Sequence, residues 1–338
     1  GVGYWGKNLL RNFVNCKQTD LIGIYDTDTR LATEKIGQYS NLRLYNTLEE
    51  LYDDPRVDGV AIATPVGSHC SLAMQALNAG KHVLVEKPLC LSYADATNLV
   101  KTATQRNLTL MCDHTFCYSG PVATLHNIIQ NEVLGDLLYV NSVRTNLGLF
   151  QKDVNVLWDL APHDLSIAKF VLGDRYKPTG LQASAVYHPD SIHAADAHLS
   201  LTLGDEVTLN IHNSWISPVK TRQMTFVGTK NMVVWDDLLP TEKIKVYEKS
   251  ASLGKGGFTY VNGSVIIPPV DEKEPLLEVV QEFADHIKNG TTPRLDAESA
   301  SDIVRILETA NLSLENRCLE WITKTQSFLF RFLSITAN

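Results

Sequence analysis

The 338-residue sequence has few cysteines, little excess charge and no long hydrophobic run. Its six cysteines are scattered without a Cys-x-x-Cys pair, which argues against a disulfide-stapled fold and favours a reducing, cytoplasmic location. A net charge of −8 at pH 7 argues against nucleic acid and anionic membrane surfaces as partners, because both attract clustered lysine and arginine. No apolar run reaches the length of a transmembrane helix, and no signal peptide is expected.

The cysteines also do not indicate a metal centre. Cys112 and Cys117 flank Asp113 and His114, but this spacing fits no common zinc pattern. We therefore predict that the chain holds no metal.

The length favours two domains, and the sequence pattern changes near residue 118. Before it, apolar segments alternate with helical patterns, which is typical of a parallel, doubly wound α/β sheet. The expected strands are 21–25, 57–64, 82–85 and 108–112. Over residues 119–316 the pattern predicts an α+β domain with an open, mostly antiparallel sheet, with strands at 137–146, 181–188, 196–203, 206–215 and 221–227 and helices at 121–133, 162–172, 276–287 and 297–314. Residues 317–338 form an atypical tail.

The chain opens on a glycine-rich turn, Gly1-Val2-Gly3-Tyr4-Trp5-Gly6, followed by apolar residues at helical spacing. Such a GxGxxG lets backbone approach a pyrophosphate at a helix N-terminus, although glycine clusters also mark plain turns. The strand that normally leads into this turn would precede Gly1, so the sheet is expected to lack its first strand. Together with the tail, this suggests an incomplete or frame-shifted sequence at both ends.

An acidic residue follows the next strand at the spacing expected for the adenosine ribose. Asp26 lies 20 residues past Gly6, and Asp28 is the alternative. A carboxylate there binds the ribose 2′-hydroxyl and repels a 2′-phosphate, so NAD is favoured over NADP. A plain turn or capping aspartate is the competing interpretation.

A lysine ends one of the inner strands. The apolar run 82–85 leads into Glu86-Lys87-Pro88, and Pro88 ends the strand because it cannot donate to a sheet ladder. Lys87 is thereby held at the carboxyl end of a strand, the edge where open α/β sheets bind ligands. A solvated surface lysine is the competing interpretation.

A second group of polar residues lies at Asp159 and His163, which are four apart and can face one way on a helix. Pro162 suits a first helical turn, where the helix dipole would lower the pKa of His163 and favour a neutral imidazole able to accept a proton. A capping carboxylate and a structural histidine are the alternatives.

Four motifs in this order resemble the glucose–fructose oxidoreductase, inositol dehydrogenase and rhizopine-catabolism (Gfo/Idh/MocA) family. They are the GxGxxG, the Ala63-Thr64-Pro65 turn with His69, Glu86-Lys87-Pro88, and Asp159-x-x-x-His163, and the resemblance covers about residues 1–316. It implies an NAD(P)-binding Rossmann domain, a C-terminal α/β domain with an open sheet, and reversible hydride transfer at a carbinol of a sugar, cyclitol or nucleotide-sugar. The stretch 144–164 is most similar to members acting in surface-polysaccharide or deoxysugar pathways. Many members carry Asp three positions after the histidine, where this chain has Ser166.

The resemblance assigns roles to individual residues. Lys87 would exchange the hydroxyl proton, His163 would hold or relay it, and Asp159 would bind a neighbouring hydroxyl or orient His163. Burial beside a positive nicotinamide would penalise the ammonium form of Lys87 and make it a usable base. The expected cofactor contacts are Gly1, Gly3, Tyr4, Trp5, Gly6, Asp26, Thr64, Pro65, His69, Glu86 and Lys87. The candidates for sugar recognition are Tyr118, Arg144, Asn146, Asp153 and Asn155, and His114 and Trp158 fit packing or contact equally well.

Two other functions use the same residues. One is an NAD-dependent glycosidase, since a branch of the family resembles that, and the other is a non-catalytic NAD-binding sensor. Leu199, Leu201 and Leu203 alternate along one strand and were assigned to the open face of the second sheet, which predicts a homodimer or homotetramer that covers them.

Overall fold

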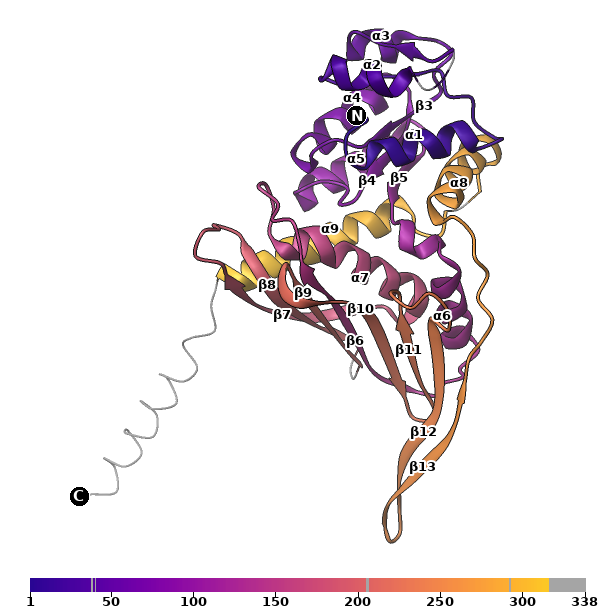
Figure 1. Ribbon diagram of the computed structural model, residues 1–338, viewed down its shortest axis with the longest axis vertical. Helices are drawn as coiled ribbons and strands as arrows, with labels where there is room; N and C mark the ends of the chain where they lie inside the picture. The colour runs from indigo at the N-terminus through magenta and orange to yellow at the C-terminus, as the bar shows by residue number, and fades with distance from the viewer. Residues whose placement is uncertain (38, 40, 205–206, 292, 316–338) are drawn as a thin grey trace, which may run out of the picture.

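The computed structural model describes residues 1–37, 39, 41–204, 207–291 and 293–315, with a nucleotide-binding-type half and a large second sheet joined by helices (Figure 1). The predicted tail 317–338 lies outside the described residues. Within those residues, no helix combines the length and apolar character needed to cross a membrane.

The N-terminal half contains the expected parallel strands, in two pieces. Its strands are β1 (Gly23–Ile24) and β2 (Arg43–Leu44) in one sheet and β3 (Gly59–Ile62), β4 (His82–Glu86) and β5 (Leu110–Asp113) in the other. Its helices are α1 (Gly6–Asn15), α2 (Thr29–Ile36), α3 (Leu48–Asp53), α4 (His69–Asn78), α5 (Tyr93–Gln105) and the 3₁₀ turns η1 (Val66–Ser68) and η2 (Thr115–Tyr118). Gly1 lies between the two pieces, with its nitrogen 3.1 Å from the Tyr25 carbonyl oxygen and its α-carbon packed against Ala63. The Rossmann-type parallel sheet is confirmed.

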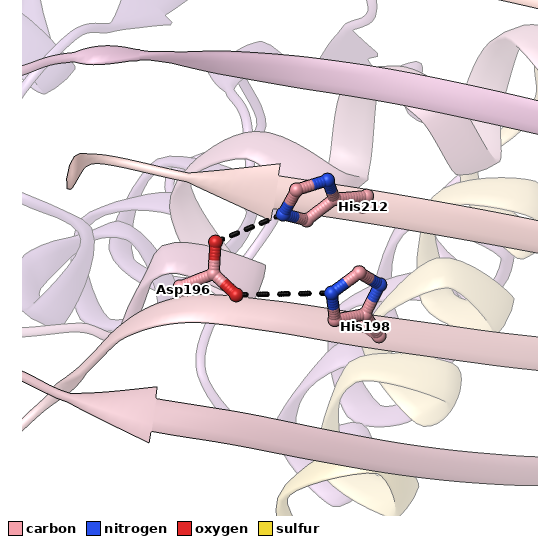
Figure 2. Close-up of side chains that lie close together, drawn as sticks. All are labelled: Asp196, His198 and His212. Atoms are coloured by element: carbon pink, nitrogen blue, oxygen red, sulfur yellow. Dashed lines mark hydrogen bonds and ion pairs between the residues drawn. The ribbon is translucent and has the colours of Figure 1, made fainter. Parts of the chain in front are cut away.

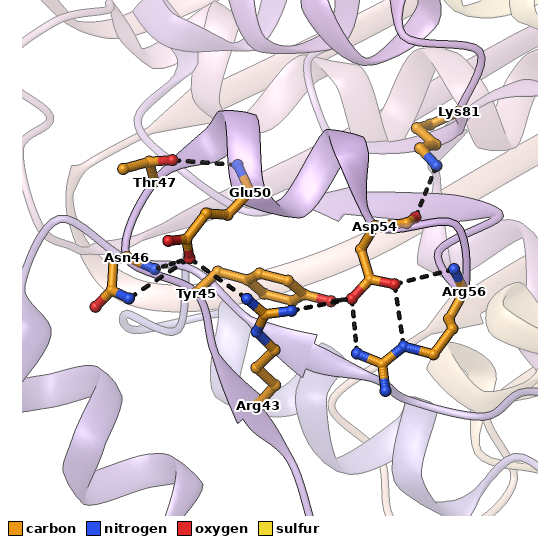
Figure 3. A network of polar contacts seen from close by, with 8 residues as sticks. All are labelled: Arg43, Tyr45, Asn46, Thr47, Glu50, Asp54, Arg56 and Lys81. Atoms are coloured by element: carbon orange, nitrogen blue, oxygen red, sulfur yellow. Dashed lines mark hydrogen bonds and ion pairs between the residues drawn. The ribbon is translucent and has the colours of Figure 1, made fainter.

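Short helix α3 is held by local polar contacts (Figure 3). The Thr47 hydroxyl caps it by accepting from the Glu50 backbone N–H at 3.1 Å, as its sequence predicts. Beyond the helix, the Asp54 carboxylate accepts from the Arg56 guanidinium at 2.7 Å and from the Tyr45 hydroxyl at 2.9 Å. The hydrogen bonds from Arg56 keep the pKa of Asp54 well below its ordinary value, so this carboxylate stays ionised and ties β2 to the start of β3.

The second half is an eight-stranded sheet of order β13-β12-β11-β10-β6-β9-β8-β7, antiparallel except for the β6–β9 pair. Its strands are β6 (Leu137–Leu147), β7 (Pro178–Tyr187), β8 (Ala194–Leu203), β9 (Val207–Ser214), β10 (Ile216–Gly228), β11 (Met232–Asp236), β12 (Ile244–Gly254) and β13 (Gly257–Ile266). Its helices are α6 (Gly120–Gln130), α7 (Val156–Leu172), α8 (Pro275–Asn289) and α9 (Ala297–Glu315), with the 3₁₀ turn η3 (Gly173–Arg175). The mostly antiparallel open sheet is confirmed.

Strands β11 to β13 were not predicted. β13 is exposed along its whole length, and the β12–β13 hairpin projects away from the helices (Figure 1). A strand with no buried face has no apolar alternation, so the period-2 signal that found the other strands is missing in β13. β11 and the start of β12 do alternate, with Val233, Trp235, Ile244 and Val246 buried, and that signal was missed.

The assignment of the β8 leucines to the open face was wrong. Leu199, Leu201 and Leu203 are at most 2% exposed and lie in the main core, where α7 packs against β8. The hydrophobic effect places the apolar side of the strand under the helix, so the open side carries the polar alternate residues. The prediction of a homodimer or homotetramer loses this support.

Helix α7 begins six residues earlier than the predicted start at 162. The Asn155 side chain caps it by accepting from the backbone N–H groups of Leu157 and Trp158 at 3.0 and 3.2 Å. Pro162 therefore lies inside the helix, and His163 lies beyond its first turn. The expectation that the helix dipole acts on His163 was wrong, since that field falls off within the first turn.

The C-terminal helices return to the nucleotide-binding half. α8 packs against α1 and η2, and α9 packs against α5 as well as β7 and α7 (Figure 1). Lys169 on α7 and Asp302 on α9 form an ion pair at 3.0 Å. Helices α8 and α9 thus pack against the first half of the chain, including β5 and the turn η2 that follows it.

Candidate active site

The three glycines of the first turn have different surroundings. A Cβ added to Gly6 would lie 2.1 Å from the Gly1 carbonyl oxygen, and one on Gly1 would lie 2.6 Å from the Ala63 carbonyl oxygen. Among the residues that the structure describes, a Cβ on Gly3 would meet nothing within 4 Å. The first and third glycines are therefore needed for packing, and the second leaves an open cradle at the start of α1. That is the division of roles expected for a pyrophosphate site, so these residues fit a dinucleotide cofactor.

Asp26 lies against this turn. Its carboxylate accepts from the Val2 backbone N–H at 2.7 Å and from the Asp28 backbone N–H at 2.9 Å. Asp28 itself caps α2 by accepting from the Leu31 N–H, so the alternative ribose ligand has a structural task. Tyr4 and Trp5 of the turn are 84% and 40% exposed, which leaves both side chains available to a bound molecule.

His69 does not present a free nitrogen to a cofactor. Its ring is 1% exposed, and its two nitrogens lie 2.9 Å from the carbonyl oxygens of Pro88 and Thr64. It joins the turn after β3, where Pro65 precedes η1, to the loop that follows Lys87. We therefore reassign His69 from cofactor contact to positioning residue.

Lys87 connects the two halves. It follows β4, and its Nζ donates to the Asp159 carbonyl oxygen at 2.8 Å and lies 3.3 Å from Asp159 Oδ1. Asp159 Oδ2 accepts from the indole Nε1 of Trp215 at 3.0 Å. Pro162 lies inside the same helix and lacks the N–H of an ordinary helical residue. The structure thus brings together Lys87 and Asp159, which are 72 residues apart.

His163 lies one turn beyond Asp159 on α7. Its Nδ1 is buried and has no partner among the described residues, and its ring packs edge-on against Phe116 with centroids 5.0 Å apart. Burial, followed by the positive charge of Lys87, lowers the pKa of His163 well below its ordinary value. A neutral imidazole is therefore expected, but for a different reason from the one inferred from the sequence.

Three polar residues at the ends of β4 and β5 form what we call the strand-end cluster: Glu86, Asp113 and His114. Glu86 and Asp113 face each other across the strand pair and are 9% and 1% exposed. Thr115 Oγ1 donates to Asp113 Oδ1 at 2.6 Å, but Glu86 Oε1 and Asp113 Oδ2 have no partner in the described part of the chain. Burial, together with the charge of Asp113, raises the pKa of Glu86 well above its ordinary value, and burial raises that of Asp113.

His114 adds a buried imidazole to this cluster. It is 2% exposed, and neither ring nitrogen has a partner among the residues described. Burial, followed by the charge of Lys87, lowers its pKa to about 4, so it is neutral at pH 7. Buried polar groups usually have hydrogen-bond partners. These groups, which lack partners among the described residues, lie at the carboxyl edge of the sheet, where such folds bind ligands.

Arg144 belongs to a different arrangement, which we call the Asp164 cluster: Ser142, Arg144, Asp164 and Asn213. Asp164 is fully buried and accepts from Ser142 Oγ at 2.9 Å, Arg144 Nε at 3.1 Å and Asn213 Nδ2 at 2.9 Å. Arg144 is 5% exposed and its guanidinium also stacks over Phe116 at 4.7 Å. Arg144 thus has a structural task beside Asp164, and its role as a sugar contact stays a prediction.

The other predicted sugar contacts are dispersed. Tyr118 is 4% exposed and its hydroxyl donates to Glu282 on α8, while Asn155 caps α7 and donates to Asn311 at 2.9 Å. Both have structural partners. Asn146 follows Arg144 on β6, and Asp153 is exposed in the loop that leads to α7. The role of all five residues in substrate recognition stays a prediction.

Two residues of the site were not found from the sequence. Asp113 directly ends an expected strand, so the rule that selected Lys87 also applies to it. Trp215 follows β9 and carries no motif, and only its 3.0 Å hydrogen bond to Asp159 reveals its role.

Comparison with known proteins identifies the family of this chain. A family described as "Oxidoreductase family, NAD-binding Rossmann fold" matches residues 1–114, and the "GFO/IDH/MocA C-terminal domain" matches residues 122–234. The chain belongs to the GFO/IDH/MocA family. The resemblance carried by the four motifs is thus confirmed, and the chain is an oxidoreductase-family member with an NAD-binding Rossmann fold.

Solved structures of this family share the fold along nearly the whole chain. UDP-N-acetylglucosamine 3-dehydrogenase GnnA from Acidithiobacillus ferrooxidans has a TM-score of 0.77 at 21% identity, covering 94% of this chain and 96% of that one. GenD2 from gentamicin A biosynthesis, in complex with NAD, has a TM-score of 0.78 at 23% identity, covering 93% and 92%. At these identities the likeness establishes the fold alone.

Curated relatives match over shorter stretches. dTDP-3,4-didehydro-2,6-dideoxy-alpha-D-glucose 3-reductase of Streptomyces violaceoruber is 30% identical over 187 residues, which cover 53% of this chain and 52% of the relative. An uncharacterized oxidoreductase of Streptococcus pneumoniae is 27% identical over 199 residues, which cover 56% of this chain and 53% of the relative. The chain thus spans about half the length of these curated relatives.

Proposed function

We propose that this GFO/IDH/MocA protein is a dehydrogenase or reductase that interconverts a carbinol and a ketone on a sugar, cyclitol or nucleotide-sugar. The observation that carries the proposal is the position of Lys87, whose Nζ lies 2.8 Å from the Asp159 carbonyl oxygen and 3.3 Å from its carboxylate. An amine held at the carboxyl edge of β4, facing the helix that carries His163, can take or return a hydroxyl proton.

The open cradle at Gly3 and the carboxylate of Asp26 are the groups that would hold the cofactor. A bound nicotinamide dinucleotide would supply the hydride acceptor or donor. Asp26 favours NAD, because a carboxylate beside the ribose repels a 2′-phosphate.

The protein residues would handle the proton. Lys87 takes the hydroxyl proton on oxidation and returns it on reduction. Neutral His163 would hydrogen-bond the same hydroxyl, and Asp159, held by Trp215, would fix Lys87 and a neighbouring hydroxyl.

A nucleotide-sugar is the substrate class to test first. A UDP-sugar 3-dehydrogenase and a dTDP-sugar 3-reductase are among the proteins this chain resembles, and both names specify position 3 of the sugar. We propose the same class of substrate here.

The test is a screen of NAD and NADP reduction with UDP-sugars, dTDP-sugars, free sugars and inositols, using the Lys87→Ala variant as the comparison. We expect turnover with NAD on a nucleotide-sugar and its loss in Lys87→Ala. Release of nitrophenol from a nitrophenyl glycoside without net NADH would instead indicate an NAD-dependent glycosidase. NAD binding without turnover on any substrate would favour the non-catalytic sensor.

A further inference from the structure

The open face of the second sheet carries an acidic residue and two histidines that converge. β8 and β9 are antiparallel neighbours in which His198 stands opposite His212, and Asp196 lies two residues before His198. The alternation along each strand puts all three on the side facing away from α7, while Ala197 and Ile211 point into the core. Figure 2 shows the two rings and the carboxylate pointing toward one another.

The three ligand atoms are close enough to share one ion. Asp196 Oδ2 lies 2.8 Å from His212 Nε2, and Asp196 Oδ1 lies 3.8 Å from His198 Nε2. All three ligand atoms lie within 4.8 Å of one another. Ligands bonded at about 2.0–2.1 Å in a tetrahedral zinc site are roughly 3.3 Å apart. Because each imidazole lone pair lies in its ring plane, the two stacked rings must tilt to direct both Nε2 atoms at one ion.

We propose that Asp196, His198 and His212 form a zinc site with an open fourth position for water. The two imidazole rings stack with centroids 4.1 Å apart and an interplanar angle of 12°, which brings both Nε2 atoms to the same carboxylate. Two stacked rings that were both protonated would repel each other, whereas one dication binds both Nε2 lone pairs and the carboxylate together. Two histidines and one carboxylate are a ligand set that zinc accepts.

The backbone that carries the site is fixed, and the side chains are accessible. Both strands lie inside the sheet order, between β6 and β7, so their backbones are fixed by pairing on both sides. The side chains of His198 and His212 are 61% and 32% exposed, which gives an ion a direct path from solvent. Among the described residues, the ion-pair partners of Asp196 are only these two histidines, so no lysine or arginine competes.

The position suggests what the ion does. The register places Asp196 opposite Ser214, next to Trp215, whose indole holds Asp159, and Asn213 beside His212 binds Asp164 from the inner face. An ion that bridges β8 and β9 on the outer face would therefore stiffen the strand end that orients both carboxylates. This inference is independent of the proposed function, since it concerns metal binding and stability. It also revises the prediction of no metal centre, which considered only cysteine spacing.

The test is a calorimetric titration of the full chain with Zn²⁺ after treatment with a chelator and its removal. We expect one Zn²⁺ per chain, and at least a tenfold weaker affinity in each of His198→Gln, His212→Gln and Asp196→Asn. His188→Gln is the matched control, because His188 and Asp190 form an exposed pair at 3.7 Å without a third ligand. Its affinity should equal that of the wild type, as should the NAD affinity of all variants.

Thermal unfolding gives a second readout. Added Zn²⁺ should raise the Tm of the wild-type chain and of His188→Gln but not that of His198→Gln. Equal zinc affinity in the wild type and His212→Gln, or no stoichiometric binding, overturns the proposal.

If the variants fail to fold, wild-type crystals soaked in Zn²⁺ decide the question. A zinc-edge anomalous peak about 2.1 Å from both Nε2 atoms supports the site. Zinc bound elsewhere, or an empty cluster, overturns it.

Discussion

The strand-end cluster and the Asp164 cluster both bury carboxylates. Only the Asp164 cluster pairs its carboxylate with a cation, the Arg144 guanidinium. Asp164 accepts from three side-chain donors, one of them the Arg144 guanidinium. Glu86 and Asp113 face each other with one oxygen each left without a partner in the described part of the chain. A matched buried carboxylate holds the fold in one arrangement, whereas an unmatched pair is ready to change protonation or to meet a ligand.

Lys87 lies beside the strand-end cluster, and its replacement should have the largest effect. We expect Lys87→Ala to lower kcat by about 10²–10⁴-fold, the range for loss of a general acid–base group. NAD affinity should remain, since the glycine turn and Asp26 are untouched. Steady-state kinetics and NAD titration measure the two quantities.

The matched control for that variant is Lys101→Ala, which removes an exposed lysine on α5. Its kcat should equal that of the wild type. A Lys87→Ala enzyme with near-wild-type turnover would show that another group carries the proton.

Removing the positive charge of the Asp164 cluster should lower the free energy of unfolding. Arg144→Met leaves a buried carboxylate without its cation, and we expect a loss of about 3–5 kcal/mol in the free energy of unfolding. Urea unfolding measures this loss. The double variant Arg144→Met/Asp164→Asn should recover much of it, because no unpaired charge remains. An unchanged midpoint in the single variant would contradict the assignment of Arg144 to structure.

The unpaired imidazole of the strand-end cluster should make the fold sensitive to acid. The pKa of His114 falls from its ordinary value of about 6.5 to about 4 on folding, so below pH 6.5 the unfolded chain binds the extra proton and stability is lost as the pH falls toward 4. His114→Phe should remove this part of the loss, about 2 kcal/mol at pH 5.

Unfolding of His114→Phe and the wild type at pH 7.5 and pH 5 measures that difference. The pH 7.5 values serve as the internal control for any packing change. Parallel losses in both proteins would mean that His114 is not the responsible group.

The smallest effect is expected from replacing one carboxyl group of the Glu86–Asp113 pair. Because the pKa of Glu86 is raised on folding, the folded state is penalised as the pH rises above the ordinary value of 4.5. Glu86→Gln should therefore stabilise the chain at pH 7, and the gain should vanish below pH 4.5.

Thermal unfolding at pH 7 and pH 4 checks the Glu86→Gln prediction. Asp164→Asn is the comparison variant in the other cluster, and it should destabilise the chain at pH 7 because it weakens a satisfied pair. Destabilisation by both variants would mean that the two clusters do not differ in the way we describe.

Much of the fold was predictable from local pattern. The strand at 82–85, its end at Pro88 and the Lys87 position follow from a short apolar run and a residue that cannot join a ladder. The glycine turn needed only the spacing of Gly1, Gly3 and Gly6. Strand β13 could not be predicted because a strand exposed on both faces leaves no hydrophobic period, whereas the alternation in β11 and at the start of β12 was present and was missed.

The site was predictable only in part. Lys87 and Asp159 were named from motifs, but their contact joins segments 72 residues apart that no periodicity relates. The interpretations of Arg144, His69 and Tyr118 changed because each side chain has a hydrogen-bond partner that the sequence pattern did not indicate. A sequence shows that a side chain can form hydrogen bonds, but it does not show which residue of the folded chain is its partner.

By itself, the sequence determined the strand–helix alternation, the glycine turn and the lysine at the strand end, because these depend on neighbours along the chain. Only the tertiary structure decided which polar groups stay unmatched, which side of β8 is covered, and that Asp196, His198 and His212 converge. The physical reason is that burial and pairing are properties of the space around a side chain, and the long-range packing of α7, α8 and α9 creates that space.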